Sequence, residues 1–331
     1  IYLPVIVGLL FFVSCKGKKQ YYEESGTVFH TLYTIKYEAP HILTDKIDAE
    51  LQKFNLSLNP FNPNSIIAKV NNNEAVEVDE WFTEVFNKSM EVSRNSDGVF
   101  DITCAPLVNL WGFGFNKKDS VTPAMIDSLK TFVGYRKVHL EGKKVVKDDP
   151  RLLLNCSAIA KGYSCDVIAR LLEKEGVENY MILIGGEVVV KGVNQNGVCW
   201  RTGINLPEDD PDGIKNNYDE IVQLCKKGAI ATSGNYRNFY IKDGKKYAHT
   251  IDPRTGYPAE QSVLSATIVA NDCMTADAYA TAFMAMGLEK ARQMADSLPE
   301  IEYYVIYADE NGKHQIEYSK GMLQYLPKRK Q

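Results

Sequence analysis

The sequence lacks the short motifs that mark several large enzyme classes. It contains no H-E-x-x-H, no G-x-S-x-G and no G-x-G-x-x-G, which argues against a zinc protease, an α/β-hydrolase and a Rossmann domain. Histidine is scarce, and its five copies show no metal-binding spacing. Long runs of lysine or arginine are also absent, and the formal net charge is −4. We therefore expect no nucleic-acid partner.

Cysteine is present without a recognisable pattern, except near the start of the chain. There, residues 1–13 are uncharged and are followed by Ser14 and Cys15. A hydrophobic run ending in a small residue and cysteine is typical of a bacterial lipoprotein signal. We predict that residues 1–14 are a signal peptide, that Cys15 carries lipid, and that residues 15–25 are a polar, lipid-anchored tether. A plain signal peptide and an uncut membrane anchor are the alternatives.

The other six cysteines are widely spread and form no C-x-x-C pair. Several stand among apolar or small residues, so we expect mostly buried thiols. Disulfides are the alternative, because an exported protein meets oxidising conditions.

The rest of the composition is that of an ordinary packed protein. The chain has 331 residues, of which 45% are hydrophobic and 24% charged. Residues 26–331 are long enough for one large domain, possibly built as two intimate lobes. Helical periodicity interleaves with short alternating segments and hairpin turns, which predicts an α+β fold with mostly antiparallel sheets and flanking helices.

Individual elements follow from the same patterns. Helices are predicted to follow N-caps at Thr44 and Asp79 and to start at Thr122 and Pro123. Residues 155–176 are predicted to pass from a turn into a helix that ends at Gly176, and a further helix to cover about 275–297 with a break at Gly287. Strands or hairpins are predicted at 26–37, 136–140, 144–147, 151–154, 181–192, 200–205, 228–233, 236–251, 262–270 and 301–318.

The strongest local signal for chemistry lies in residues 274–287, MTADAYATAFMAMG. Asp277 and Thr281 are four residues apart and therefore share one face of a helix. A carboxylate and a hydroxyl are oxygen ligands, which suit a hard cation such as Mg²⁺. The alternative is structural, since an aspartate near a helix start often interacts only with the helix dipole.

A second signal is residues 155–166, NCSAIAKGYSCD. Small residues and Gly162 permit a tight turn before a helix, where Lys161 would lie beside a phosphate. The glycine spacing of a P-loop is missing, and the alternative is a surface lysine in a turn.

Three further segments are weaker candidates. His249, in YAHTIDPRTGYP, is a possible acid or base, although a lone histidine is more often structural. Ser233 and Gly234, in ATSGNYRNF, offer backbone amides to phosphate. The aromatic and glycine-rich residues 98–114 suit either the edge of a core or a wall for a flat ligand.

Together and in order, these segments resemble the ApbE family of FAD:protein FMN transferases. The resemblance runs from about Gly26 to Gly287 and is specific because many segments match in register. The matching segments are GTVFHTLYTI, LNPFNPNSIIAKVN, GVFDITCAPLVNLWGFG, NCSAIAKGYSCD, ILIGGEV, ATSGNYRNF, HTIDPRTGYP and TADAYATAFMAMG. Lipid anchoring, as predicted at Cys15, is also usual in this family.

The resemblance implies a set of Mg²⁺ ligands. They are the side chains of Asp277 and Thr281 and the backbone carbonyl of Ala158. Some family members carry a further aspartate where this chain has Ala280. We expect water or a phosphate oxygen to take that position, because Mg²⁺ commonly keeps waters.

The resemblance also implies a set of FAD contacts. Phe29 stands where many relatives have methionine, Phe61 where they often have an aromatic residue, and Asn155 where some have aspartate. The remaining positions are Val99, Phe100, Asp101, Lys161, His249 and Ile251, with Ser233 and Gly234 added because they lie close to a matching motif.

The implied reaction moves the FMN half of FAD to a serine or threonine of an exported acceptor, such as a subunit of a membrane redox pump, and releases AMP. His249 and Asp101 are both candidates for the base, by residue type alone. The expected location is the periplasmic side of a bacterial membrane. The alternatives are an Mg²⁺-dependent FAD pyrophosphatase, a passive flavin-binding lipoprotein and a purely structural lipoprotein.

Overall fold

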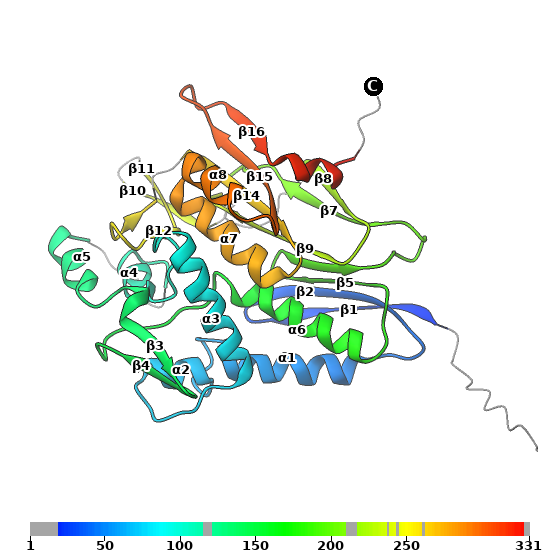
Figure 1. Ribbon diagram of the computed structural model, residues 1–331, viewed down its shortest axis with the longest axis horizontal. Helices are drawn as coiled ribbons and strands as arrows, with labels where there is room; N and C mark the ends of the chain where they lie inside the picture. The colour runs from blue at the N-terminus through cyan, green and yellow to red at the C-terminus, as the bar shows by residue number, and fades with distance from the viewer. Residues whose placement is uncertain are drawn as a thin grey trace, which may run out of the picture.

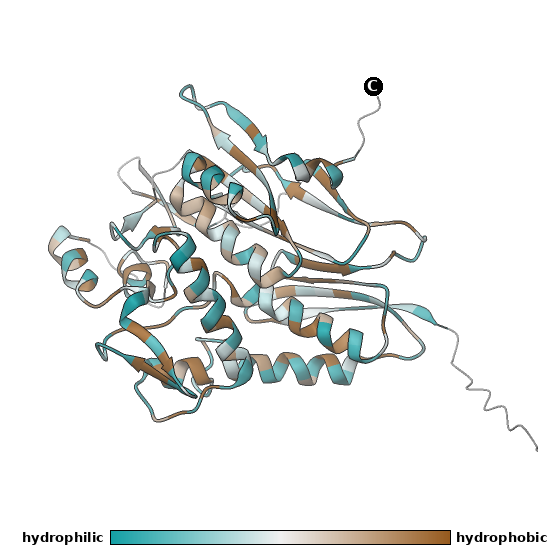
Figure 2. Ribbon diagram, in the orientation of Figure 1, coloured by the Kyte–Doolittle hydropathy of each residue, from teal (hydrophilic) through white to brown (hydrophobic). Residues whose placement is uncertain are grey.

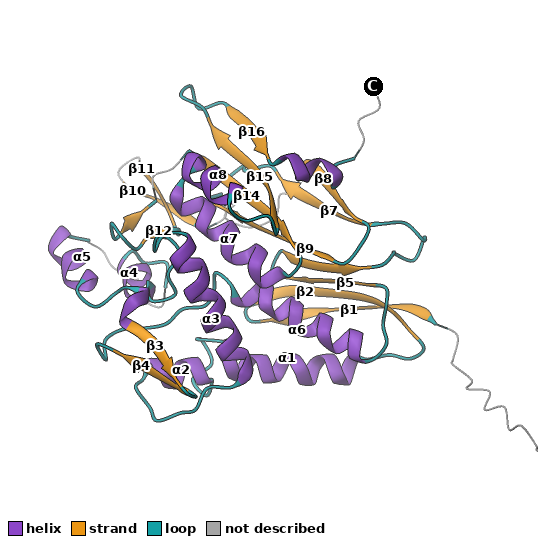
Figure 3. Ribbon diagram, in the orientation of Figure 1, coloured by secondary structure: helices purple, strands orange, loops and turns teal. Residues whose placement is uncertain are grey.

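The computed structural model describes residues 19–114, 121–209, 217–236, 238–242, 245–259 and 262–327. The predicted signal peptide and Cys15 lie outside these residues. Helices alternate with hairpins along the chain (Figure 3), so the prediction of an α+β fold with mostly antiparallel sheets is confirmed.

An antiparallel sheet of eight strands forms the centre of the protein (Figure 1). Its spatial order is β1-β2-β5-β6-β9-β14-β15-β16, and each pair of neighbours is antiparallel. The strands are β1 (Gln20–Val28), β2 (Thr31–Ala39), β5 (Tyr180–Ile184), β6 (Glu187–Lys191), β9 (Gly228–Gly234), β14 (Val263–Ala270), β15 (Ile301–Ala308) and β16 (His314–Tyr318).

The two faces of the sheet have different partners. Helices α6 (Ala160–Lys174) and α7 (Cys273–Met286) lie side by side on one face, and α1 (Thr44–Leu58) and α3 (Glu80–Asn95) pack against them (Figure 1). The other face packs on the hairpin of β7 (Trp200–Asn205) and β8 (Tyr218–Leu224). Alternating side chains of β6 serve both cores, because successive residues of a strand point to opposite faces.

Helix α7 is unusual because it is buried on all sides. Thr281 is its one residue that is not fully buried. Figure 2 shows pale and brown residues along α7, whereas the turns of α1 alternate between teal and brown. A helix that is apolar all round belongs in a protein interior, so its polar residues Asp277 and Thr281 need a specific explanation.

Smaller elements surround this centre. They are α2 (Ile66–Asn71), α4 (Ala105–Leu110), α5 (Pro123–Lys130), β3 (Val138–Glu141), β4 (Lys144–Lys147), β10 (Phe239–Lys242), β11 (Lys245–Ala248), β12 (Ile251–Asp252), β13 (Tyr257–Pro258), α8 (Leu288–Asp296) and the 3-10 turns Tyr135–Lys137 and Lys320–Gln324. Among the described residues, no helix has both the length and the apolar character needed to cross a membrane.

The prediction of one strand at 26–37 is wrong, because the chain turns back in the middle of it. Phe29 and His30 form a two-residue turn, with φ of 51° and 60°, between the paired strands β1 and β2. Strand β1 starts at Gln20, so residues 20–25 of the predicted tether belong to the folded sheet.

Two further strand predictions need correction. The segment 151–154 makes only a single parallel bridge, between Leu153 and Cys104. The strand predicted at 136–140 begins as the 3-10 turn Tyr135–Lys137 and becomes β3 only from Val138.

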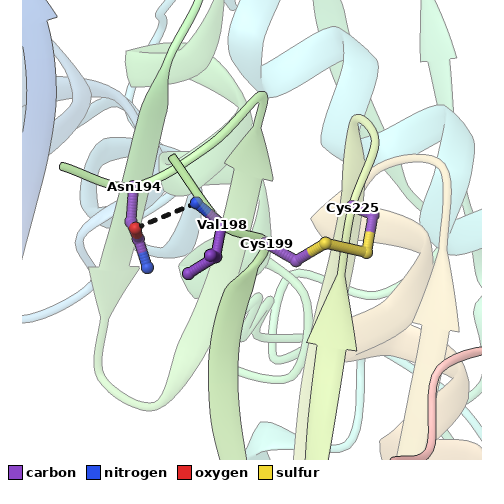
Figure 4. The surroundings of a disulfide bond; sticks show 4 residues. All are labelled: Asn194, Val198, Cys199 and Cys225. Carbon is purple, nitrogen blue, oxygen red and sulfur yellow. Dashed lines mark hydrogen bonds between the residues drawn. A yellow bond between two sulfur atoms is a disulfide. The ribbon is translucent and has the colours of Figure 1, made fainter. Parts of the chain in front are cut away.

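The cysteines are mostly free thiols, as predicted, but one pair is bonded. Cys199 and Cys225 form a disulfide at the base of the β7–β8 hairpin (Figure 4). The neighbouring turn is held by a hydrogen bond from the Val198 amide to Asn194 Oδ1. The free thiols are Cys104, Cys156, Cys165 and Cys273.

Candidate active site

The polar residues of α7 face the start of α6 and the end of β9. Asp277 is only 2% exposed, and its Oδ2 accepts a hydrogen bond of 2.9 Å from the Gly162 amide. Thr281, one turn further along, lies 3.2 Å from the Ser233 hydroxyl, oxygen to oxygen. The helical spacing therefore places a carboxylate and a hydroxyl on one face, as the sequence predicted.

Gly162 is the third residue of α6, which begins at Ala160. The amides of the first turn of a helix have no carbonyl acceptor within that helix. The Gly162 amide is satisfied by Asp277 of the neighbouring helix. Within the described chain, no backbone amide donates to the Ala158 carbonyl, so this oxygen is available to a ligand.

Gly162 is required by how closely the two helices approach. A Cβ at this position would lie 2.2 Å from the Cys273 carbonyl oxygen and 2.8 Å from the Asp277 Cβ. Any side chain would push α6 away from α7 and break the hydrogen bond between them. Glycine thus brings the carboxylate of one helix to the open turn of the other.

Lys161 lies between two carboxylates. Its Nζ is 2.7 Å from Glu187 Oε1 and 3.7 Å from Asp277 Oδ2. Burial alone lowers the pKa of Lys161, but the charges of Asp277 and Glu187 outweigh it and raise the pKa above the ordinary value. Lys161 is therefore a fixed positive charge beside Asp277, and its side chain remains one-third exposed.

His249 lies close enough to Lys161 for their charges to interact. Its Nδ1 is 3.1 Å from the Asn238 carbonyl oxygen, and its ring meets the edge of Phe113 at 6.4 Å between centroids. Burial lowers the pKa of His249, and the positive charge of Lys161 lowers it further, against the opposing effect of the Asn238 carbonyl.

Asp101 is buried and accepts hydrogen bonds from its own loop and from the turn at Tyr135. Its Oδ1 accepts from the amide and the hydroxyl of Thr103, and its Oδ2 accepts from the Tyr135 amide, all at 2.7 Å. The side chains of Val99 and Phe100 are 3% and 2% exposed and belong to the core. Neither residue presents its side chain to a ligand in this structure.

The aromatic residues predicted at the flavin site are arranged around the β1–β2 turn. Phe29 packs on Phe54, with 5.0 Å between ring centroids. Phe61 is 54% exposed and meets the ring of His30 edge-on at 5.3 Å. At the turn, therefore, Phe29 is partly buried against the core, whereas the neighbouring Phe61 is exposed.

Three predicted ligand residues remain, namely Asn155, Ile251 and Gly234. The Asn155 amide donates to the Ile102 carbonyl, which joins this turn to the loop of Asp101. The Asn155 side chain accepts from the Ser157 amide. Ile251 is buried beside α4 and α5, and Gly234 ends β9 next to Ser233.

Comparison with known proteins places the chain in one family. Residues 29–305 match the ApbE family. The chain belongs to the ApbE family. It is 35% identical to the FAD:protein FMN transferase of Vibrio cholerae over 89% of this chain and 90% of that protein. The protein of the same name from Escherichia coli is 32% identical over 88% of both chains.

Solved structures of the ApbE family have the same fold. The flavin transferase ApbE from Vibrio cholerae superimposes with a TM-score of 0.83, at 34% identity, over 93% of this chain and all of that one. The ApbE protein from Thermotoga maritima gives 0.80 at 28% identity, with the same coverage. The predicted fold and the stated resemblance are both confirmed.

The residues of this ApbE chain fit a magnesium ion. Gly162 occupies only one oxygen of Asp277, and no described residue donates a hydrogen bond to Asp277 Oδ1. The Ala158 carbonyl is likewise unused, and the Thr281 hydroxyl lies one helical turn from Asp277. These are hard oxygen donors, too few for a complete shell, which suits a cation that keeps several waters.

Sequence reasoning missed two carboxylates at this site. Glu187 was quoted in ILIGGEV without a role, although an acidic residue inside an apolar strand is a signal. Asp166 of α6 accepts from the amides of Cys273 and Met274 and so caps α7. Burial raises the pKa of Asp166 to about 7. Its position facing the start of α7 depends on the tertiary fold.

Proposed function

We propose that this chain is an Mg²⁺-dependent enzyme that transfers the FMN half of FAD to a serine or threonine of an acceptor protein and releases AMP. The observation that carries the proposal is that the buried Asp277 accepts from the Gly162 amide through one oxygen only and lies beside Lys161, while no described backbone amide donates to the Ala158 carbonyl. Relatives also support the proposal, because proteins that are similar to this chain over most of their own length are named FAD:protein FMN transferase.

The reaction is a displacement at the diphosphate of FAD. The acceptor hydroxyl oxygen bonds to the phosphorus on the flavin side, and the bond from that phosphorus to the bridging oxygen breaks. The electron pair leaves with AMP, and the hydroxyl proton passes to a base. Lys161 places a positive charge where negative charge grows on the phosphate oxygens. When bound at Asp277, Thr281 and Ala158, Mg²⁺ supplies further neutralisation of that charge.

The structure favours His249 over Asp101 as the base. The Asn238 carbonyl can only accept, so the neutral His249 ring carries its proton on Nδ1 and leaves the Nε2 lone pair for the hydroxyl proton. No described residue hydrogen-bonds to Nε2. Asp101, by contrast, accepts three hydrogen bonds from Thr103 and Tyr135, which suits a residue that shapes its loop.

The pH dependence of transfer follows from the lowered pKa of His249. The base is active when neutral, so activity is expected to persist below the ordinary histidine pKa of about 6.5 and to fall as pH drops through the lower pKa of the folded protein. The rate of AMP release should be measured between pH 4.5 and 8. His249→Gln should lower the rate about 100-fold or more and abolish this acid limb. If the acid limb of the pH profile were unchanged in His249→Gln, another group would be the base.

The reaction itself is tested with purified protein, FAD, Mg²⁺ and an exported redox-pump subunit whose flavin-bearing threonine is known. We expect AMP release only with this acceptor, and an FMN adduct on its threonine by mass spectrometry. The matched control is the same acceptor with that threonine changed to alanine, which should release no AMP. Chelation of Mg²⁺ should stop the reaction.

Other outcomes of this experiment identify the alternatives. Equal AMP release without acceptor would indicate an FAD pyrophosphatase. Bound FAD that stays intact in the presence of Mg²⁺ and acceptor would indicate a passive flavin-binding lipoprotein. A protein that does not bind flavin at all would be a purely structural lipoprotein.

The proposal includes a lipid anchor at Cys15 and a location on the periplasmic side of a bacterial membrane. Its support is the uncharged run of residues 1–13 before Ser14 and Cys15. Mass spectrometry of the mature N-terminal peptide tests it, since an unmodified Cys15 would remove the anchor.

A further inference from the structure

The ion pairs of Lys161 are unequal. Its ammonium makes a hydrogen-bonded contact of 2.7 Å with Glu187 and only a longer contact of 3.7 Å with Asp277. All three charges lie where α6, α7 and β6 meet. The lysine is therefore held mainly by the strand, although a carboxylate of the neighbouring helix lies within reach.

The difference between the two distances matters because, in the proposed function, Asp277 also binds a divalent cation. A lysine that paired directly with Asp277 would compete with a divalent cation for the same carboxylate charge. The free oxygen of Asp277 and the free carbonyl of Ala158 serve a cation only if the ammonium stays on its other partner. Cation binding therefore requires a residue that keeps the Lys161 ammonium at the observed 3.7 Å from Asp277 Oδ2.

We propose that Glu187 is a positioning residue that holds Lys161 away from Asp277 and so keeps the Asp277 carboxylate available to the metal ion. The inference rests on the metal site of the proposed function and assigns the role of one residue toward it.

The surroundings of Glu187 support this role. Glu187 is 4% exposed, and its Oε2 is buried without a hydrogen bond from any described residue. Burial raises the pKa of Glu187, and the Lys161 ammonium opposes that rise. A buried glutamate with one unpartnered oxygen is costly to the fold, and the Lys161 ammonium on its other oxygen offsets part of that cost.

The bend before Glu187 also contacts the Lys161–Glu187 pair. Gly185 has φ of +68°, and a Cβ there would lie 3.0 Å from Lys161 Cδ and 3.1 Å from Glu187 Oε2. The lysine stem and the glutamate thus both pack against the backbone of this bend. The position of the ammonium is set by packing as well as by charge.

Binding of Mn²⁺, a spectroscopic substitute for Mg²⁺, tests the inference without catalysis. Electron paramagnetic resonance titration should give a Kd for the wild type that rises roughly tenfold in Glu187→Gln, a coupling of ordinary size between neighbouring sites. The double variant Lys161→Met with Glu187→Gln removes the competitor as well and should return the Kd close to that of the wild type.

Glu187→Asp separates position from charge. It keeps the negative charge but is one methylene shorter, so it cannot hold Lys161 in the same place. We expect its Kd to rise as in Glu187→Gln. A wild-type Kd in Glu187→Asp would mean that charge alone matters and would overturn the positioning role.

A matched control lies at the other end of the same two elements. Glu173 of α6 pairs with Lys191 of β6 at 3.3 Å and with Lys227 at 2.9 Å, so it is another glutamate–lysine contact between these elements, away from Asp277. Glu173→Gln should leave the Mn²⁺ Kd unchanged. Thermal unfolding of every variant completes the comparison, since a lower Tm in Glu187→Gln with an unchanged Kd would show a purely structural role and overturn the inference.

Asp277→Asn distinguishes failure of the inference from failure of the proposed function. Mn²⁺ binding that depends on Asp277 but not on Glu187 overturns the inference alone. Binding by the wild type that is indifferent to Asp277 refutes the metal site, and the inference with it.

Discussion

Asp277→Asn is expected to reduce FMN transfer by on the order of a thousandfold while the protein remains folded. Asparagine has nearly the same shape and keeps an oxygen that can accept from the Gly162 amide. It lacks the negative charge that binds a cation and balances Lys161. AMP release at saturating FAD and Mg²⁺ measures the effect, and circular dichroism checks the fold.

Asp272→Asn is the matched control on the same helix. Asp272 is the N-cap of α7, where its side chain accepts from the Thr275 amide, and asparagine caps equally well. This variant should keep near wild-type activity, because the charge that it removes is not at the cation site. Retained activity in Asp277→Asn at millimolar Mg²⁺ would count against the site, whereas equal losses in both variants would indicate a general electrostatic effect.

Much of the fold could be predicted because its signals are local. Asp79 and Thr122 cap the helices predicted to start there, with their side chains accepting from the amides of Phe82 and Met125. Gly287 separates α7 from α8 as expected. Each of these features is decided by residues within one or two turns of each other.

The turn at Phe29 and His30 could not be predicted from the same rules. Two-residue hairpin turns with positive φ at both positions favour asparagine and glycine. Here an aromatic residue and a histidine adopt φ of 51° and 60°, so alternation appeared to continue through the turn. Tertiary contacts with Phe54 and Phe61 accompany this conformation, and the local sequence does not reveal them.

The disulfide and the role of Glu187 were hidden for a related reason. Cys199 faces Cys225 only because Trp200 pairs with Leu224 across the β7–β8 hairpin, and a long connection separates the two strands. The site motifs likewise gave Lys161 and Asp277 as separate signals. That Glu187 lies 2.7 Å from the lysine depends on how β6 packs under α6.

Gly162→Ala is expected to cost about 3 kcal/mol of unfolding free energy and most of the transfer activity. The new Cβ would meet the Cys273 carbonyl oxygen at 2.2 Å, and a backbone atom cannot swing aside as a flexible side chain would. The helices must separate, so the Gly162 amide moves away from Asp277 and the open turn at Ala158 loses its geometry. Urea unfolding and AMP release measure the two effects.

Gly228→Ala provides the comparison, since a Cβ there would make only ordinary contacts, the nearest at 3.6 Å from Leu224. It should change stability by less than about 1 kcal/mol and leave transfer intact. In Gly162→Ala, the loss of stability and the loss of transfer should have the same cause, the separation of α6 from α7. The affinity for Mn²⁺ should therefore fall even without urea, where the protein is folded. A variant that is destabilised but binds Mn²⁺ with wild-type affinity would show that helix contact and cation site are independent, contrary to the geometry of the Gly162 hydrogen bond.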